Sequence, residues 1–158
     1  MAETPAGDAT DDGGPGDENR GGRGDERCPV CSAPTVFRPV PDGCRGLLPD
    51  DPRIVRVCTR CLHVEGAPGR PVDRDWEPAE LSEALPSDAA GAVGIAMLVT
   101  FLDSLVLNRR EIGAVVTYLE ADAGVDPLSA LERLADDPAL SIPLDLRGRR
   151  TQLAQLLE

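Results

Sequence analysis

Four cysteines stand in two pairs of identical spacing and could together bind one metal ion. The pairs are Cys28-Pro-Val-Cys31 and Cys58-Thr-Arg-Cys61, separated by 26 residues. Two-residue spacers let each pair chelate from a tight turn, and four soft thiolates satisfy the tetrahedral coordination of zinc without a redox role. The pattern therefore predicts one structural zinc ion bound by Cys28, Cys31, Cys58 and Cys61.

Other uses of the cysteines have weaker support. A rubredoxin-like iron site uses the same four-cysteine pattern but usually lies in an aromatic core, and this region offers only Phe37. A thioredoxin-like redox pair at Cys28 and Cys31 needs a preceding strand, which the sequence does not indicate. Cys44 and His63 could replace a ligand or open the site for catalysis. Because four better-spaced thiolates are present, we interpret Cys44 as a free or half-buried thiol in the turn after Gly43 and His63 as a partly exposed strand residue.

Antiparallel strands are expected to bring the two cysteine pairs together. Short strands are predicted at residues 35–40 and 53–57, with a third at 62–64 and a turn at 41–43. These strands contain too few apolar residues to hold such a module together without a metal. Metal binding would therefore contribute folding energy on the order of 10 kcal/mol. We therefore predict a four-cysteine zinc ribbon over residues 27–66. The 26 residues between the two cysteine pairs exceed the common spacing of about 15 to 20 residues. We assign the excess to the loop from Cys44 to Pro52.

The charge of the chain is strongly acidic and its basic residues are all arginine. The 158 residues carry a formal net charge of −12, with 16 arginines and no lysine. In concentrated salt the screening length falls to about 3 Å, so this acidity need not destabilise the fold. Residues 27–70 are the only locally basic part, with seven arginines against four acidic residues. A zinc tetrathiolate would remove most of that excess, so charge alone does not favour a nucleic-acid partner.

Cys28-Pro-x-Cys31, a strand pair and Cys58-x-x-Cys61 resemble the zinc-ribbon families. The lysine-free acidic setting resembles small haloarchaeal proteins with an N-terminal four-cysteine ribbon and a C-terminal helical part. The resemblance implies zinc but no particular activity, since ribbons occur in transcription factors, RNA polymerase subunits, ribosomal proteins and enzymes. The glycine that often follows the second cysteine of each pair is replaced by Ser32 and Leu62.

The segments on either side of the ribbon differ in composition. Residues 1–26 are rich in Gly, Asp and Glu, lack large aliphatic residues after Met1, and are predicted to form a disordered acidic tail. They do not resemble a signal peptide, so a cytoplasmic protein with reduced thiols is expected. Residues 67–77 are predicted to be a linker, and Trp76 to dock the ribbon or linker on the helical part.

Residues 78–158 are predicted to form a domain of four to five helices, which makes the fold class α+β. A short helix is expected from Pro78 to Leu85, and a main helix from Ser87 as N-cap to about Leu107. The main helix is apolar around most of its circumference, which suits a buried central helix or a membrane span. Its unbroken apolar stretch, Ala89 to Leu102, is shorter than the ~18 to 20 residues of a span, so the buried helix is favoured.

Capping signals predict the remaining helices. Asn108-Arg-Arg-Glu111 resembles a capping box, Gly124 is expected to end that helix, and Asp126-Pro127 to begin the next. Residues 140–146 alternate in polarity, which suggests an extended edge segment, and a last helix follows. Residues 121–131 also resemble the turn of a helix-turn-helix. The second helix is acidic, however, and would repel phosphates.

No catalytic or cofactor-binding residues are predicted, because no base, nucleophile pair or open metal position is recognisable. The favoured function is that of a zinc-binding, non-catalytic interaction or adaptor protein of a halophilic archaeon, with a protein partner. The alternative is a nucleic-acid-associated or transcriptional ribbon that uses the arginines of the module: Arg38, Arg53, Arg56 and Arg60. A membrane-associated protein and a redox or iron protein have less support.

Overall fold

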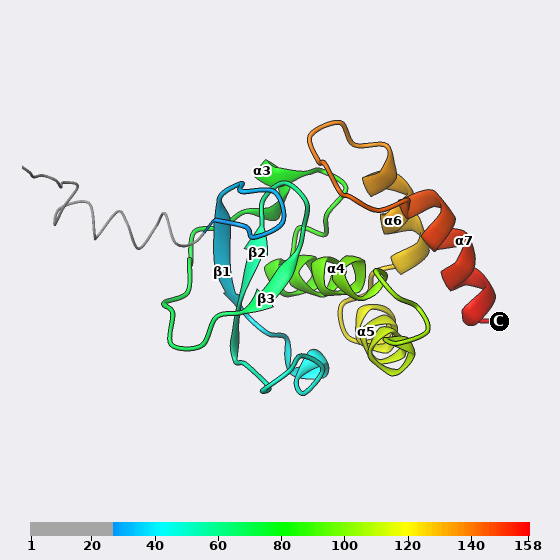
Figure 1. The fold of residues 1–158 in the computed structure, drawn as a ribbon, viewed down its shortest axis with the longest axis horizontal. Coiled ribbons are helices and arrows are strands. Elements are labelled where there is room, and N and C mark those ends of the chain that lie inside the picture. The colour runs from blue at the N-terminus through cyan, green and yellow to red at the C-terminus, as the bar shows by residue number, and fades with distance from the viewer. Residues whose placement is uncertain (1–26) are drawn as a thin grey trace, which may run out of the picture.

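The computed structural model describes residues 27–158 and has an α+β fold (Figure 1). Within these residues, an antiparallel sheet of order β1-β2-β3 precedes five α-helices. The strands are β1 (Thr35–Pro39), β2 (Ile54–Cys58) and β3 (Val64–Gly66), and a 3-10 turn, η2 (Asp42–Cys44), follows β1. The helices are α3 (Pro78–Leu81), α4 (Ala89–Phe101), α5 (Arg109–Ala121), α6 (Pro127–Ala135) and α7 (Leu146–Leu156). The predicted fold class is confirmed, whereas the predicted tail of residues 1–26 lies outside the described residues.

The sheet presents one apolar face to the helices. Val55 and Val57 of β2 are two residues apart, so both side chains point to the same face, and both are fully buried. Val57 pairs with Val36 of β1 and with Val64 of β3, which extends this face across all three strands. The predicted third strand at 62–64 begins two residues later than expected, because β2 continues to Cys58 and the turn at residues 59–61 follows it.

Helix α4 is the centre of the hydrophobic core. It lies between the sheet and α5 (Figure 1), and nearly all of its residues are buried. One cluster of buried side chains joins Val55 and Val57 of the sheet, Ile95 and Leu98 of α4, and Leu153 of α7. The buried-helix interpretation of this segment is therefore confirmed. No helix in the described part of the chain has the length and apolar character needed to cross a membrane.

The ends of α4 differ from the prediction. Asp88, rather than Ser87, is its N-cap, and its carboxylate accepts a hydrogen bond of 3.1 Å from the Gly91 N–H. The helix ends at Phe101, not at Leu107. Asn108 makes no capping hydrogen bond to α5, so the predicted capping box is wrong. Its side-chain amide instead donates to the Phe101 carbonyl oxygen at 2.9 Å, an acceptor at the end of α4 that also receives the Ser104 N–H at 3.2 Å.

The C-terminal part contains a helical pair and one irregular segment. Asp126 caps α6 by accepting from the Leu128 N–H at 3.1 Å, and Gly124 takes a left-handed φ of 67°, as predicted. Residues 140–146, predicted to be an extended edge segment, form no strand: residues 140–145 are irregular and Leu146 is the first residue of α7. Ser141 in this segment donates its N–H to the carbonyl oxygen of Arg60 at 2.8 Å. The segment is thereby tied to the second cysteine pair.

The stretch predicted to be a linker covers the free edge of β1. Asp73 donates its N–H to the Phe37 carbonyl oxygen at 2.8 Å, and its carboxylate accepts from the Phe37 N–H at 2.8 Å. These bonds occupy backbone groups that an edge strand would otherwise expose. The short helix α3 ends at Leu81 rather than Leu85. Trp76 is partly buried against the main core, as expected for a residue that docks this segment on the helices.

Candidate metal centre

The four predicted cysteines come together at one end of the sheet. Cys28 and Cys31 lie in a turn before β1, while Cys58 ends β2 and Cys61 follows in the turn before β3. Strand pairing brings the turns together, because Thr35 lies opposite Cys58 in the antiparallel register. The four Sγ atoms lie within 4.8 Å of one another and form a group that can hold a metal ion.

The two turns have matching backbone conformations. The Cys28 N–H donates to the Ala33 carbonyl oxygen and the Cys58 N–H to the His63 carbonyl oxygen, each over five residues and at 2.9 Å. The residue after each second cysteine takes a left-handed φ, 68° at Ser32 and 64° at Leu62. Glycine is the usual residue in this conformation. The turn geometry is therefore formed although glycine is absent from both positions.

Backbone N–H groups point at two of the sulfur atoms. The Val30 N–H donates to Sγ of Cys28, and the Arg60 N–H makes the equivalent bond to Sγ of Cys58, both at 3.3 Å. The Cys61 N–H also donates to Sγ of Cys58 at 3.3 Å. Such bonds orient a sulfur and stabilise its anionic form, as outer-shell partners do in metal sites. These hydrogen bonds therefore favour the thiolate form of the two sulfurs and direct them toward a shared centre.

The donor set and its dimensions fit a tetrahedral ion. Zinc–sulfur bonds of about 2.3 Å place the sulfurs of a tetrahedral site about 3.8 Å apart. The Sγ atoms of Cys28 and Cys61 are 3.6 Å apart, and those of Cys31 and Cys58 are 3.4 Å apart. All four are free cysteines. The sulfurs therefore lie close to the spacing that a zinc tetrathiolate requires.

The thiols differ in how readily they ionise. Burial raises the pKa of Cys58 and Cys61 above the usual value. Burial also opposes ionisation of Cys31, but hydrogen bonds from the Ala33 backbone and from the neighbouring thiols lower its pKa overall. Cys31 is also the least buried member of the group. A metal ion would favour the thiolate form of all four, because thiolate rather than thiol is the ligand.

Cys44 and His63 both lie apart from the sulfur cluster. Cys44 is a free thiol, 1% exposed in the main core, so it is more deeply buried than the half-buried thiol that the sequence suggested. Burial, followed by the charge of Asp122, raises its pKa to about 12. His63 is partly exposed as predicted, and its Nε2 lies 3.3 Å from a Glu65 carboxylate oxygen. Neither residue belongs to the metal-binding group.

Residues 27–157 match the model of the family of unknown function DUF6276. The chain belongs to this family. The match includes the four cysteines and all the helices described above. No curated protein and no solved structure is significantly similar to the chain. Because the function of DUF6276 is unknown, membership of the family does not indicate an activity for the cysteine site.

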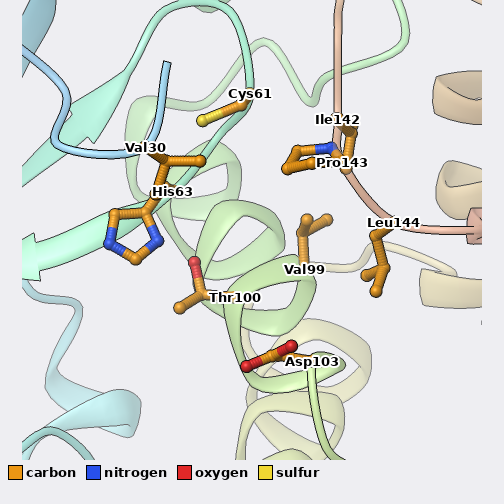
Figure 2. A pocket seen from close by; sticks show the side chains of 9 residues that line it. All are labelled: Val30, Cys61, His63, Val99, Thr100, Asp103, Ile142, Pro143 and Leu144. Atoms are coloured by element: carbon orange, nitrogen blue, oxygen red, sulfur yellow. The ribbon is translucent and has the colours of Figure 1, made fainter. Parts of the chain in front are cut away.

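The structure also shows two contributors to the site's surroundings that the sequence did not indicate. Thr100 of α4 accepts a hydrogen bond of 3.0 Å from the Val64 N–H, which fixes β3 on the helix. Val30, between the first two cysteines, is half exposed and lines a pocket with Cys61 and His63 (Figure 2). Periodicity could not reveal these contacts, because they join segments far apart in the sequence.

Proposed function

We propose that the four cysteines bind one structural zinc ion and that the protein acts as a non-catalytic interaction protein. The observation that carries this proposal is the convergence of four Sγ atoms within 4.8 Å. Four protein thiolates complete a tetrahedral coordination sphere, which leaves no position for a substrate. A bound zinc ion would fix the two cysteine turns to each other.

Structural zinc has a clear purpose in this fold. The cluster around the cysteines contains few other buried residues: Ala33 is the only apolar one. The turn that carries Cys28 and Cys31 therefore has little hydrophobic support of its own, whereas the second turn is anchored in the main core by Leu62. A bound ion would hold them together, and through them the start of β1 and the end of β2. Loss of the ion is expected to loosen this end of the sheet before the helical core.

Metal content provides the direct test. Protein purified under reducing conditions in concentrated salt is expected to contain one zinc ion per chain, and Cys58→Ser is expected to lose it. Cys44→Ala is the matched control, because Cys44 is buried outside the site, and it should retain the ion. Replacement by Co²⁺ should give the absorption of a tetrahedral thiolate complex. Absence of zinc in the parent, or iron with a visible charge-transfer band, would overturn the proposal.

The composition supports a protein that works in concentrated salt inside a cell. A charge of −12 without lysine suits the salt-rich cytoplasm of a halophilic archaeon, where reduced thiols are available to a metal. Raising the KCl concentration is expected to raise the melting temperature of the zinc-loaded protein. A melting temperature that falls with added KCl would argue against a halophilic origin.

A nucleic-acid-associated function is the second candidate, favoured by the local basic charge of the ribbon. Arg53 and Arg60 are exposed. Arg38 instead donates to the Asp73 carbonyl oxygen at 2.6 Å, and Arg56 pairs with Glu65 at 3.1 Å. Two of the four arginines therefore make contacts within the chain. Binding to a mixed-sequence duplex should weaken steeply with salt if phosphates are contacted, and Arg53→Ser with Arg60→Ser should abolish that slope.

A further inference from the structure

A pocket beside the cysteine site is open to a partner (Figure 2). Its volume is about 240 Å³. Val30 and His63 border it from the side of the cysteine turns, the end of α4 lines it with Val99, and Ile142 and Leu144 border it from the segment before α7. Most of this lining is apolar, whereas Asp103 stands at one rim. The pocket therefore suits an aliphatic side chain accompanied by a positive charge.

The loop that begins at this rim presents two exposed aliphatic side chains. Val106 and Leu107 are 87% and 81% exposed, the highest values among the large hydrophobic residues of the described chain. Transfer of each side chain from water to an apolar site is favourable, in proportion to the apolar area that is buried. We call Val106 and Leu107 the apolar tip. Such a pair of neighbours is a stronger sign of an interaction site than single exposed residues are.

Hydrogen bonds hold the apolar tip in a defined conformation. The Leu107 N–H donates to the Ser104 hydroxyl at 3.2 Å, and the Asn108 N–H donates to the Ser104 carbonyl oxygen at 3.0 Å. The Asn108 side chain fixes the end of the loop on Phe101. A tip that is already ordered loses little conformational entropy when it binds.

Charged groups on both sides of the tip lack partners within the described chain. The Asp103 carboxylate, at the rim of the pocket, makes no ion pair there, and neither does Arg109, directly after the tip. Arg149 contacts Asp103 only at its backbone oxygen, at 3.5 Å. The loop from Asp103 to Arg109 thus joins an aliphatic tip, followed by an available cation, to an apolar pocket with an available anion at its rim.

We propose that this surface binds a second copy of the chain as a two-fold symmetric dimer. The apolar tip of each copy enters the pocket of the other, and Arg109 of each copy faces Asp103 of the other. A two-fold interface requires that one patch be complementary to itself. Here the tip and the pocket complement each other in shape and charge, so a two-fold axis that passes between the tip and the pocket forms both contacts at once. This inference goes beyond the metal site and does not depend on which ion the cysteines bind.

A charge exchange between two variants provides the sharpest test. Asp103→Arg and Arg109→Asp each place like charges at both contacts of their own dimer. Each is expected to dimerise at least tenfold more weakly than the parent in sedimentation equilibrium. A mixture of the two variants places opposite charges at both contacts, so a heterodimer should form with near-parental affinity. The measurements use metal-loaded, full-length protein at the lowest salt that leaves its circular dichroism unchanged.

Matched apolar variants test the tip itself. Leu107→Asp should be monomeric, whereas Leu157→Asp, a change at another exposed leucine on the last turn of the chain, should remain dimeric. Metal content and melting temperature of each variant would show that loss of the dimer is not loss of the zinc site or of the fold. A monomeric parent, a dimer unaffected by Leu107→Asp, or a variant mixture that stays monomeric would overturn the proposal. So would a monomer whose tip binds vesicles of anionic phospholipid.

Discussion

The backbone N–H of Val64 donates a hydrogen bond of 3.0 Å to the side-chain hydroxyl of Thr100. This bond joins β3 of the ribbon to α4 of the helical part, between residues 36 positions apart. The hydroxyl in turn lies 3.0 Å from the Ala96 carbonyl oxygen, to which it donates. Val64 is 3% exposed, so its N–H has little access to water as an alternative partner. A helical threonine therefore completes the hydrogen bonding of a strand.

Removal of this hydroxyl is expected to destabilise the protein. Thr100→Val keeps the shape of the side chain but leaves the Val64 N–H without an acceptor, which should lower the free energy of unfolding by about 1–3 kcal/mol. Thr100→Ser should retain most of the stability. Thr117→Val on the exposed face of α5 serves as control and should change stability by less than about 0.5 kcal/mol. Urea denaturation in concentrated salt measures all three, and equal effects of Thr100→Val and Thr117→Val would contradict the prediction.

Two glycines of the helical core should respond to alanine in opposite directions. A Cβ at Gly94 of α4 would lie 2.9 Å from Cε2 of Tyr118 and 3.0 Å from Cδ2 of Leu119, so overpacking should cost about 1–3 kcal/mol. A Cβ at Gly113 of α5 would meet nothing within 4 Å. There the higher helix propensity of alanine should stabilise the protein by about 0.5–1 kcal/mol. Thermal unfolding distinguishes the two, and a stabilising Gly94→Ala would show that α4 and α5 are less closely packed.

The N-cap of α6 should contribute more to stability when it is ionised than when it is protonated. Hydrogen bonds from the Ser129 hydroxyl and from the backbone lower the pKa of Asp126. Its contribution is therefore complete above the ordinary aspartate pKa of about 4 and is lost as the pH falls through the lower pKa of the folded state. Asp126→Ala should cost about 1 kcal/mol at neutral pH, and the difference from the parent should shrink below pH ~4. Asp126→Asn, which keeps an acceptor without the charge, should remove this pH dependence.

The cysteines should react with iodoacetamide in a definite order. After a chelator is added to the folded protein, Cys31 should be modified first, because its pKa is lowered and it is the least buried of the site cysteines. Cys44, with a pKa of about 12 and 1% exposure, should react only when the helical core unfolds. Peptide mass spectrometry over time gives the order, and urea-unfolded protein provides the reference. Modification of Cys44 as fast as Cys31 would show that the core opens together with the metal site.

The elements closest to the cysteines could be predicted well, because local chemistry determines them. The cysteine spacing identified the four residues whose sulfurs converge. Short runs of β-branched residues located β1 and β2 to within one residue. Asp126 followed by proline is a local signal for a helix start, and α6 begins there. In each case the residues that determine the structure are neighbours in the sequence.

The loop after α4 could not be predicted, because its structure depends on contacts between turns. Residues 102–107 continue the apolar composition of α4, so composition alone extended the helix to Leu107. The structure ends it at Phe101, where the Ser104 N–H and the Asn108 side chain both donate to the Phe101 carbonyl oxygen. The pocket was equally hidden, since Val30 and Leu144 meet there only after folding. Ser32 and Leu62 show a related limit, because the turns impose a positive φ on residues that rarely adopt one.

The position of α4 along the chain also has a consequence for protein synthesis. Both cysteine pairs and two of the three strands are complete by Cys61, 28 residues before α4 begins at Ala89. If the cysteines bind a metal ion as proposed, a chain that emerges from the ribosome N-terminus first can therefore bind it and begin to form the sheet before its most apolar helix appears. Val55 and Val57 then offer that helix an apolar surface during translation. In a nascent chain that lacks the metal, α4 would instead emerge before an apolar surface is available to it, and the chain would be prone to aggregate.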